Sequence, residues 1–144
     1  MEEKELSNLY LDLSKNAIKK IDFSGSHDDF ISQLYFFDCI LNSLNFFADE
    51  INQYFDQDSL FASSNCINKW KKLSEISAIN NIVLKEISPN GFIDDIISSK
   101  KILLDKKNEN LIISNNMNDL KKYKDIINKY GEFIDLLRKI LNEC

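Results

Sequence analysis

Residues 28–55 read DDFISQLYFFDCILNSLNFFADEINQYF. Apolar side chains recur in this stretch at alternating steps of four and three positions, which is the spacing of one face of an α-helix. A second apolar stripe runs beside the first, and a face this wide predicts a central helix with several neighbours. The first stripe consists of Phe30, Leu34, Phe37, Leu41, Leu44, Ala48, Ile51 and Phe55, and the second of Phe36, Ile40, Phe47 and Tyr54.

Helical spacing also predicts helices over residues 3–22, 66–87, 92–103 and 118–142. The segment Ser24-Gly25-Ser26 ends the first helix, and Ser26 is expected to cap the next one with Asp29 three residues on. Asparagines weaken the pattern of 66–87, so that a break near 62–65 or 80 is compatible with the sequence. Ser88-Pro89-Asn90-Gly91 is the strongest turn signal.

Two further residues have specific expected roles. Trp70 fits the apolar stripe of residues 66–87, which favours a place in the core over an exposed contact. Gly131 stands beside the apolar seam of residues 118–142 and is expected to allow close approach of another helix.

Residues 101–114 allow two interpretations. The pattern is compatible with a helix followed by a loop, which we favour slightly, and also with a small β-hairpin. Elsewhere the chain of 144 residues has only three Gly and one Pro, whereas sheet proteins with many turns use both often. The sequence therefore predicts one domain, residues 1–144, of the all-α class: an antiparallel bundle of four or five helices.

Residue types that support catalysis or metal binding are sparse. The single histidine, His27, lies in a polar segment, and the cysteines Cys39, Cys66 and Cys144 are widely spaced. Three isolated glycines cannot form a phosphate-binding loop. We therefore expect no enzyme activity, no catalytic residue, no metal site and no cofactor. A deep pocket with converging polar groups would reopen the question of an enzyme.

The surroundings of the protein can also be anticipated from composition. The start, MEEKEL, lacks the basic and apolar regions of a signal peptide, and no segment approaches the length of an apolar membrane span. A net charge of −5 disfavours direct binding of nucleic acid. The sequence predicts a cytoplasmic protein without membrane contact.

Charge is distributed unevenly along the chain. No lysine or arginine occurs between Lys20 and Lys69, and this stretch contains eight acids, whereas the remaining chain carries 18 basic and 15 acidic residues. Two interpretations are open: lysines of other helices neutralise the block within the fold, which we favour slightly, or the block is a surface for a basic partner. The candidate partner-binding residues are Asp28, Asp29, Asp38, Asp49, Glu50, Asp56, Asp58 and Tyr54.

These features favour a non-enzymatic inhibitor, of the immunity or anti-defence type, that masks a basic and conceivably nucleic-acid-cleaving protein through an acidic helix surface. The alternative is a helical adaptor, or a viral module that binds a host factor, with an apolar groove served by the phenylalanines of residues 30–55. A homodimer formed through the seams of 30–55 and 120–141 is a further alternative. Reversing Asp49, Glu50, Asp56 and Asp58 to lysine is expected to leave the fold intact and to weaken partner binding.

Overall fold

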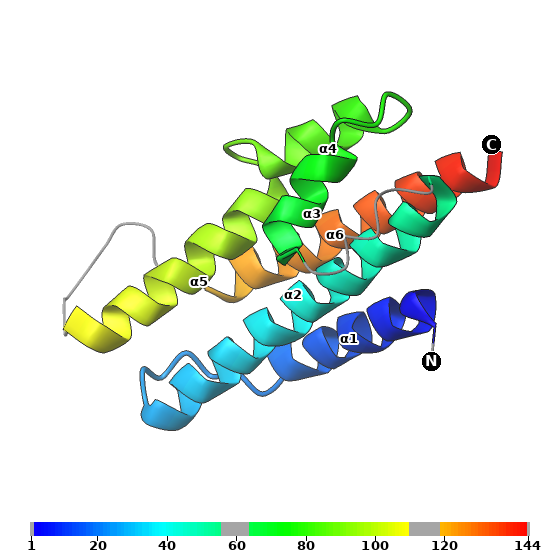
Figure 1. The fold of residues 1–144 in the computed structure, drawn as a ribbon. Coiled ribbons are helices and arrows are strands. Elements are labelled where there is room, and N and C mark those ends of the chain that lie inside the picture. Colours follow the sequence, from blue (N-terminus) through cyan, green and yellow to red (C-terminus); the bar gives the residue numbers. More distant parts are fainter. Residues whose placement is uncertain (1, 56–63, 110–118, 144) are drawn as a thin grey trace.

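The computed structural model describes residues 2–55, 64–109 and 119–143, and these residues form helices without any strand (Figure 1). The predicted all-α class is confirmed. The predicted helix of 66–87 is divided into two short helices by a turn over residues 74–79. The helices are α1 (Glu3–Ile18), α2 (His27–Phe55), α3 (Cys66–Leu73), α4 (Asn80–Ile87), α5 (Phe92–Glu109) and α6 (Leu120–Glu143).

The connection between α1 and α2 is organised by Asp29. Its backbone N–H donates to Ser26 Oγ at 3.1 Å, which confirms the predicted cap at the start of α2. The Asp29 carboxylate accepts the backbone N–H groups of Phe23 at 2.9 Å and Gly25 at 3.2 Å. Phe23 and Gly25 both have positive φ, so the loop turns tightly and these hydrogen bonds hold it in place.

Helices α2 and α6 run in the same direction, side by side (Figure 1). Side-chain hydrogen bonds join the two helices, and the residue numbers of the partners increase on both helices in the same order. This order is that of a parallel pair. The bonds join Tyr123 to Gln33, Tyr130 to Ser43 and Arg138 to Glu50. The predicted antiparallel packing therefore holds for α1 with α2 and for α5 with α6, whereas the two heptad-like helices depart from it because α3, α4 and α5 lie in the connection between them.

Aromatic side chains from four helices form the centre of the core. Trp70 of α3 is fully buried, as predicted, and its indole N–H donates to the Leu44 carbonyl at 3.2 Å. The Phe133 ring lies 5.2 Å from Trp70 and 5.0 Å from Phe92, measured between ring centroids. Phe47 of α2 completes the cluster at 5.6 Å from Trp70. These rings join α2, α3, α5 and α6, and they bury much of the apolar area that stabilises the fold.

The turn between α4 and α5 depends on Gly91. A Cβ atom at this position would lie 2.2 Å from the carbonyl oxygen of Glu86, so a side chain cannot be accommodated without movement of the backbone. The N–H of Gly91 donates to the Ser88 carbonyl at 2.9 Å, and the Glu86 carboxylate accepts the N–H of Phe92 at 3.3 Å. The predicted turn at 88–91 therefore sets the point at which α5 begins.

Two expectations can be compared with the structure. Residues 101–109 continue α5, as in the favoured helical interpretation, so the first strand of the alternative hairpin is wrong, and residues 110–114 lie outside the described residues. A Cβ at Gly131 would have no described heavy atom within 4 Å, so helix packing there does not require a glycine. Gly131 instead lines a polar cleft of about 400 Å³ between α1 and α6, beside Asn8 and Arg138.

Candidate functional site

Two of the candidate acids on α2 form ion pairs inside the fold. The ammonium of Lys69, whose side chain is 2% exposed, lies 2.8 Å from Asp49 Oδ1. Arg138 donates from Nη2 to Glu50 Oε1 at 2.8 Å and from Nε to Oε2 at 3.0 Å. Because a partly buried charge that loses its partner is destabilising, reversing Asp49 and Glu50 to lysine should damage the fold. The expectation that this reversal leaves the fold intact is therefore withdrawn.

The remaining acids of the block have different surroundings. Asp29 is buried in the α1–α2 connection, where it also accepts a hydrogen bond from Gln33 Nε2 at 2.9 Å. Asp38 pairs with Lys100 of α5 at 3.2 Å and remains about half exposed, and Asp28 is exposed. Tyr54 is exposed, whereas Asp56 and Asp58 lie outside the described residues.

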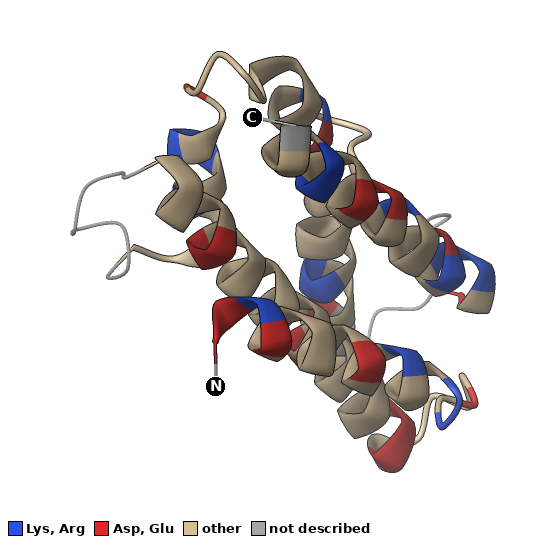
Figure 2. Cartoon of the chain, turned by 90° about the vertical axis from the view of Figure 1, so that its right-hand side faces the viewer, with Lys and Arg blue, Asp and Glu red and all other residues tan. Residues whose placement is uncertain are grey.

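Three of the eight acids of the block, Asp38, Asp49 and Glu50, are thus paired with cations from other helices. Figure 2 shows acidic and basic residues interspersed along most of the helices in view. Lys69, Lys100 and Arg138 come from α3, α5 and α6, which are far from α2 in the sequence. What remains outward-facing on α2 is a narrower surface than the sequence suggested.

One outward stripe of α2 combines acids with large apolar side chains. Asp28, Ile31, Tyr35 and Asp38 follow one another at steps of three, four and three, so they share one face of the helix. Ile31 is 49% exposed and Tyr35 is 48% exposed. We call these four residues the α2 stripe. An exposed tyrosine and isoleucine between two carboxylates is a surface that a basic protein could contact.

Most phenylalanines of residues 30–55 contribute to packing within the fold. Phe36, Phe37 and Phe47 are fully buried, and Phe30 and Phe55 pack against the core from partly buried positions. Phe46 is partly buried and stacks on Tyr10 of α1. In the described part of the chain, these side chains are therefore engaged in the fold rather than in an exposed groove wall.

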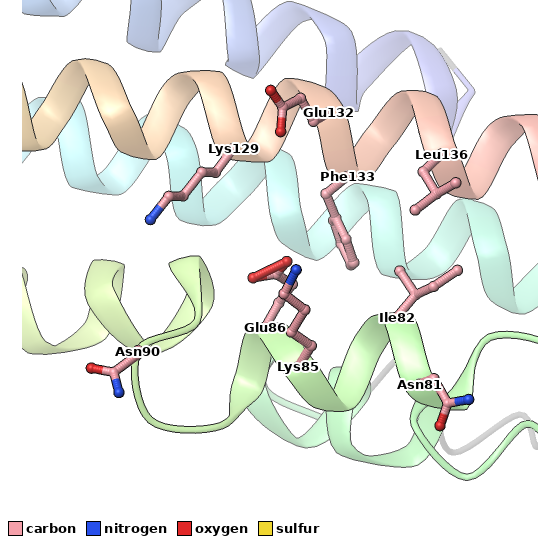
Figure 3. Close-up of a pocket in the computed structure, with 9 residues that line it drawn as sticks. All are labelled: Asn81, Ile82, Lys85, Glu86, Asn90, Lys129, Glu132, Phe133 and Leu136. Carbon is pink, nitrogen blue, oxygen red and sulfur yellow. The ribbon is translucent and has the colours of Figure 1, made fainter.

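A cleft does lie between α4 and α6 (Figure 3). Its volume is about 500 Å³. Phe133 and Leu136 point from α6 toward α4, and Ile82 points from α4 toward α6, so these three side chains form an apolar half. The polar part of the lining is formed by Asn81, Lys85, Glu86, Asn90, Lys129 and Glu132. The sequence analysis did not anticipate this cleft, because it depends on how the short helix α4 lies against α6.

Nucleophilic side chains among the described residues are not activated. Burial raises the pKa of the Cys66 thiol to about 12, and nearby Asp49 raises it further while Lys69 opposes the shift. Burial likewise raises the pKa of Cys39 and of Tyr130. The Tyr130 hydroxyl hydrogen-bonds Ser43 Oγ at 2.8 Å, and that hydroxyl in turn donates to the Ser7 carbonyl at 2.7 Å. The hydroxyl groups of Tyr130 and Ser43 therefore have hydrogen-bond partners in the core.

The described residues also bear on metal ligation and on membrane insertion. Within the described part of the chain, no group of three or more His, Cys, Asp or Glu side chains is placed to hold a metal ion. None of the helices in that part combines the length and the apolar character needed to cross a bilayer.

Comparison of the chain with known protein families, with curated proteins and with solved structures found no match.

Proposed function

We propose that this chain is a non-enzymatic protein-binding protein of the inhibitor or immunity type, which masks a basic partner through the α2 stripe. The observation that carries the proposal is the pair of half-exposed side chains, Ile31 and Tyr35, between Asp28 and Asp38. Tyrosine is enriched among the residues that dominate binding energy, because it combines a large apolar area with little loss of conformational freedom.

The charges of the stripe support the choice of a basic partner. Asp28 is exposed and makes no ion pair with a described residue, and Asp38 keeps about half of its surface exposed beside Lys100. Carboxylates at the edge of a contact act mainly on the rate of association and on the choice of partner. We therefore expect association to slow as salt is raised, while Ile31 and Tyr35 supply most of the affinity.

The state of the described thiols and of His27 supports this proposal over an enzyme. The thiols of Cys39 and Cys66 have raised pKa values, so both are protonated at neutral pH. His27 is exposed at the start of α2, and its Ser26 neighbour is engaged in the helix cap. A protein that acts by covering another macromolecule needs none of these groups to react.

The test uses a photo-reactive cross-linker in place of Tyr35, with the full chain expressed in the cells from which the sequence comes. The cross-linked protein is identified, purified, and its binding measured at about 50 and about 300 mM salt, a range over which screening of exposed charges increases strongly. We expect one basic protein whose association rate falls with salt. Tyr35→Ala should weaken binding at least about tenfold, as for a contact worth more than 1.4 kcal/mol.

The matched control is reversal of an exposed acid elsewhere. Asp38→Lys should slow association, whereas Asp125→Lys on α6 changes the net charge equally and should have little effect. A cross-linked partner that is acidic, or that binds the Tyr35→Ala variant as tightly as the original chain, would overturn the proposal.

A further inference from the structure

We propose that the cleft between α4 and α6 is a second binding site, which accepts a short peptide segment of a partner protein carrying a bulky apolar side chain close to a carboxylate. This site is separate from the α2 stripe, and its occupant has the opposite charge to the basic partner proposed there. The binding site proposed in this cleft is therefore independent of the function proposed for the α2 stripe.

The apolar half of the cleft is suited to one large side chain. Leu136 is 45% exposed although it stands beside Phe133, which is almost completely buried. Ile82 faces both from α4 and is partly buried (Figure 3). A side chain placed between Ile82 and Leu136 would remove apolar surface from water on both walls, and this burial would favour binding.

The other half of the cleft carries two lysines on facing walls. Lys85 points from α4 toward α6, and Lys129 points from α6 toward α4 (Figure 3). Neither ammonium forms an ion pair with any residue that the structure describes. Two lysines without a carboxylate partner, beside an apolar surface, provide the charge complementarity for an acidic group.

The two acids that line the cleft form no ion pair with these lysines. The Glu86 carboxylate accepts the backbone N–H of Phe92, so one of its oxygens is occupied by the first turn of α5. Glu132 points away from α4 in the same view (Figure 3). An incoming carboxylate could therefore form a charge-assisted hydrogen bond with Lys85 or with Lys129.

The dimensions favour a peptide segment as the occupant. A volume of about 500 Å³ falls within the usual range of ligand sites, but the cleft lies between two helices at the surface. A groove between neighbouring helices is a common receptor for a segment that offers one or two apolar anchors. Because the anchoring chemistry is an apolar side chain and a carboxylate, the segment is acidic and apolar.

In the experiment, peptides that bind the immobilised full chain are selected from a displayed library of random peptides. Peptides that also bind the Leu136→Arg variant are removed. Arginine at this exposed position should fill the apolar half while leaving the fold intact. We expect enriched peptides in which Leu, Ile or Phe stands within a few residues of Asp or Glu. Leu84→Arg is the matched control, since Leu84 is similarly exposed on α4 but does not line the cleft.

A synthetic peptide from the selection is then titrated against lysine variants. The double variant Lys85→Ala/Lys129→Ala should bind at least about tenfold more weakly, as expected for loss of a charge-assisted contact. Lys71→Ala/Lys139→Ala removes the same charge from exposed positions outside the cleft and should bind normally. Circular dichroism establishes that each variant is folded. The inference is overturned if no peptide is enriched, if the enriched peptides lack acids, or if both double variants bind equally.

Discussion

The guanidinium of Arg138 donates hydrogen bonds to both oxygens of the Glu50 carboxylate, from Nε to Oε2 at 3.0 Å and from Nη2 to Oε1 at 2.8 Å. Its remaining nitrogen, Nη1, donates to Asn8 Oδ1 at 3.0 Å, and the group lies 5.3 Å from the centre of the Phe47 ring. One side chain thus joins α6 to α1 and α2. Arg138 is also the only arginine in the chain.

Arg138→Lys should lower the free energy of unfolding by about 2 kcal/mol, because an ammonium cannot reproduce the two parallel hydrogen bonds to Glu50. Urea unfolding monitored by circular dichroism measures the change. Asp38→Asn is the comparison, since its ion pair with Lys100 is exposed and should contribute no more than about 1 kcal/mol. Equal effects of the two substitutions would contradict the structural role assigned to Arg138.

Asp49→Lys should destabilise the fold by about 3–5 kcal/mol, because it places a second cation beside the buried ammonium of Lys69. Asp28→Lys changes the net charge equally at an exposed position and should cost only about 0.3–1 kcal/mol, through the helix dipole of α2. Thermal unfolding of both variants provides the measurement. Similar melting temperatures would show that the Lys69–Asp49 pair contributes little.

Gly131→Ala should raise the free energy of unfolding by about 0.5–1 kcal/mol, since the residue is in the interior of α6 and the added methyl group has open space around it. Urea unfolding of this variant is compared with that of Gly91→Ala. The latter should be destabilised, because its Cβ would collide with the Glu86 carbonyl. Destabilisation by Gly131→Ala would indicate that the neighbouring α1–α6 cleft does not tolerate the methyl group.

Stability should fall as the pH rises from about 9 toward about 12, and Cys66 should contribute to the fall. The unfolded thiol loses its proton near 9.0, whereas burial raises the pKa of Cys66 in the folded chain to about 12. Over this window the folded state binds more protons than the unfolded state, so each pH unit costs up to about 1.4 kcal/mol for this group. The stability that the protonated Cys66 thiol contributes is present in full below pH 9, and it is lost progressively as the pH rises from about 9 toward about 12.

Urea unfolding at pH 8 and at pH 10 measures this slope. Cys66→Ala should flatten the dependence relative to the original chain, whatever its effect on stability at pH 8. Because Tyr130 also has a raised pKa, some alkaline loss should remain in the variant. An unchanged slope would mean that Cys66 ionises similarly in the folded and unfolded chains.

Much of the fold could be predicted from local pattern. The spacing of apolar residues located α1, α2 and α6, because a helical period is a property of neighbouring residues alone. The cap of Ser26 on Asp29 and the turn ending at Gly91 were likewise visible, since each depends on a few consecutive residues. The division of 66–87 was compatible with its asparagines, which compete with helical hydrogen bonding.

The candidate site was much less predictable. A run of acids without lysine left open whether the block is a negative surface or is neutralised within the fold. The partners of Asp38, Asp49 and Glu50 could not be identified from the sequence, because these cations are 62, 20 and 88 positions away. The cleft between α4 and α6 could not be predicted from the sequence, because its lining residues come from two helices that are far apart in the chain and meet only in the folded structure.

The sequence by itself determined that the chain is helical, where α1, α2 and α6 lie, and which of their faces are apolar. Only the tertiary structure decided that α2 and α6 run parallel and that the acids of α2 are mostly paired within the fold. The physical reason is that periodicity is local and has no direction in space. Which side chains meet across two helices depends on their relative direction and register, and these are set by the packing of the whole core.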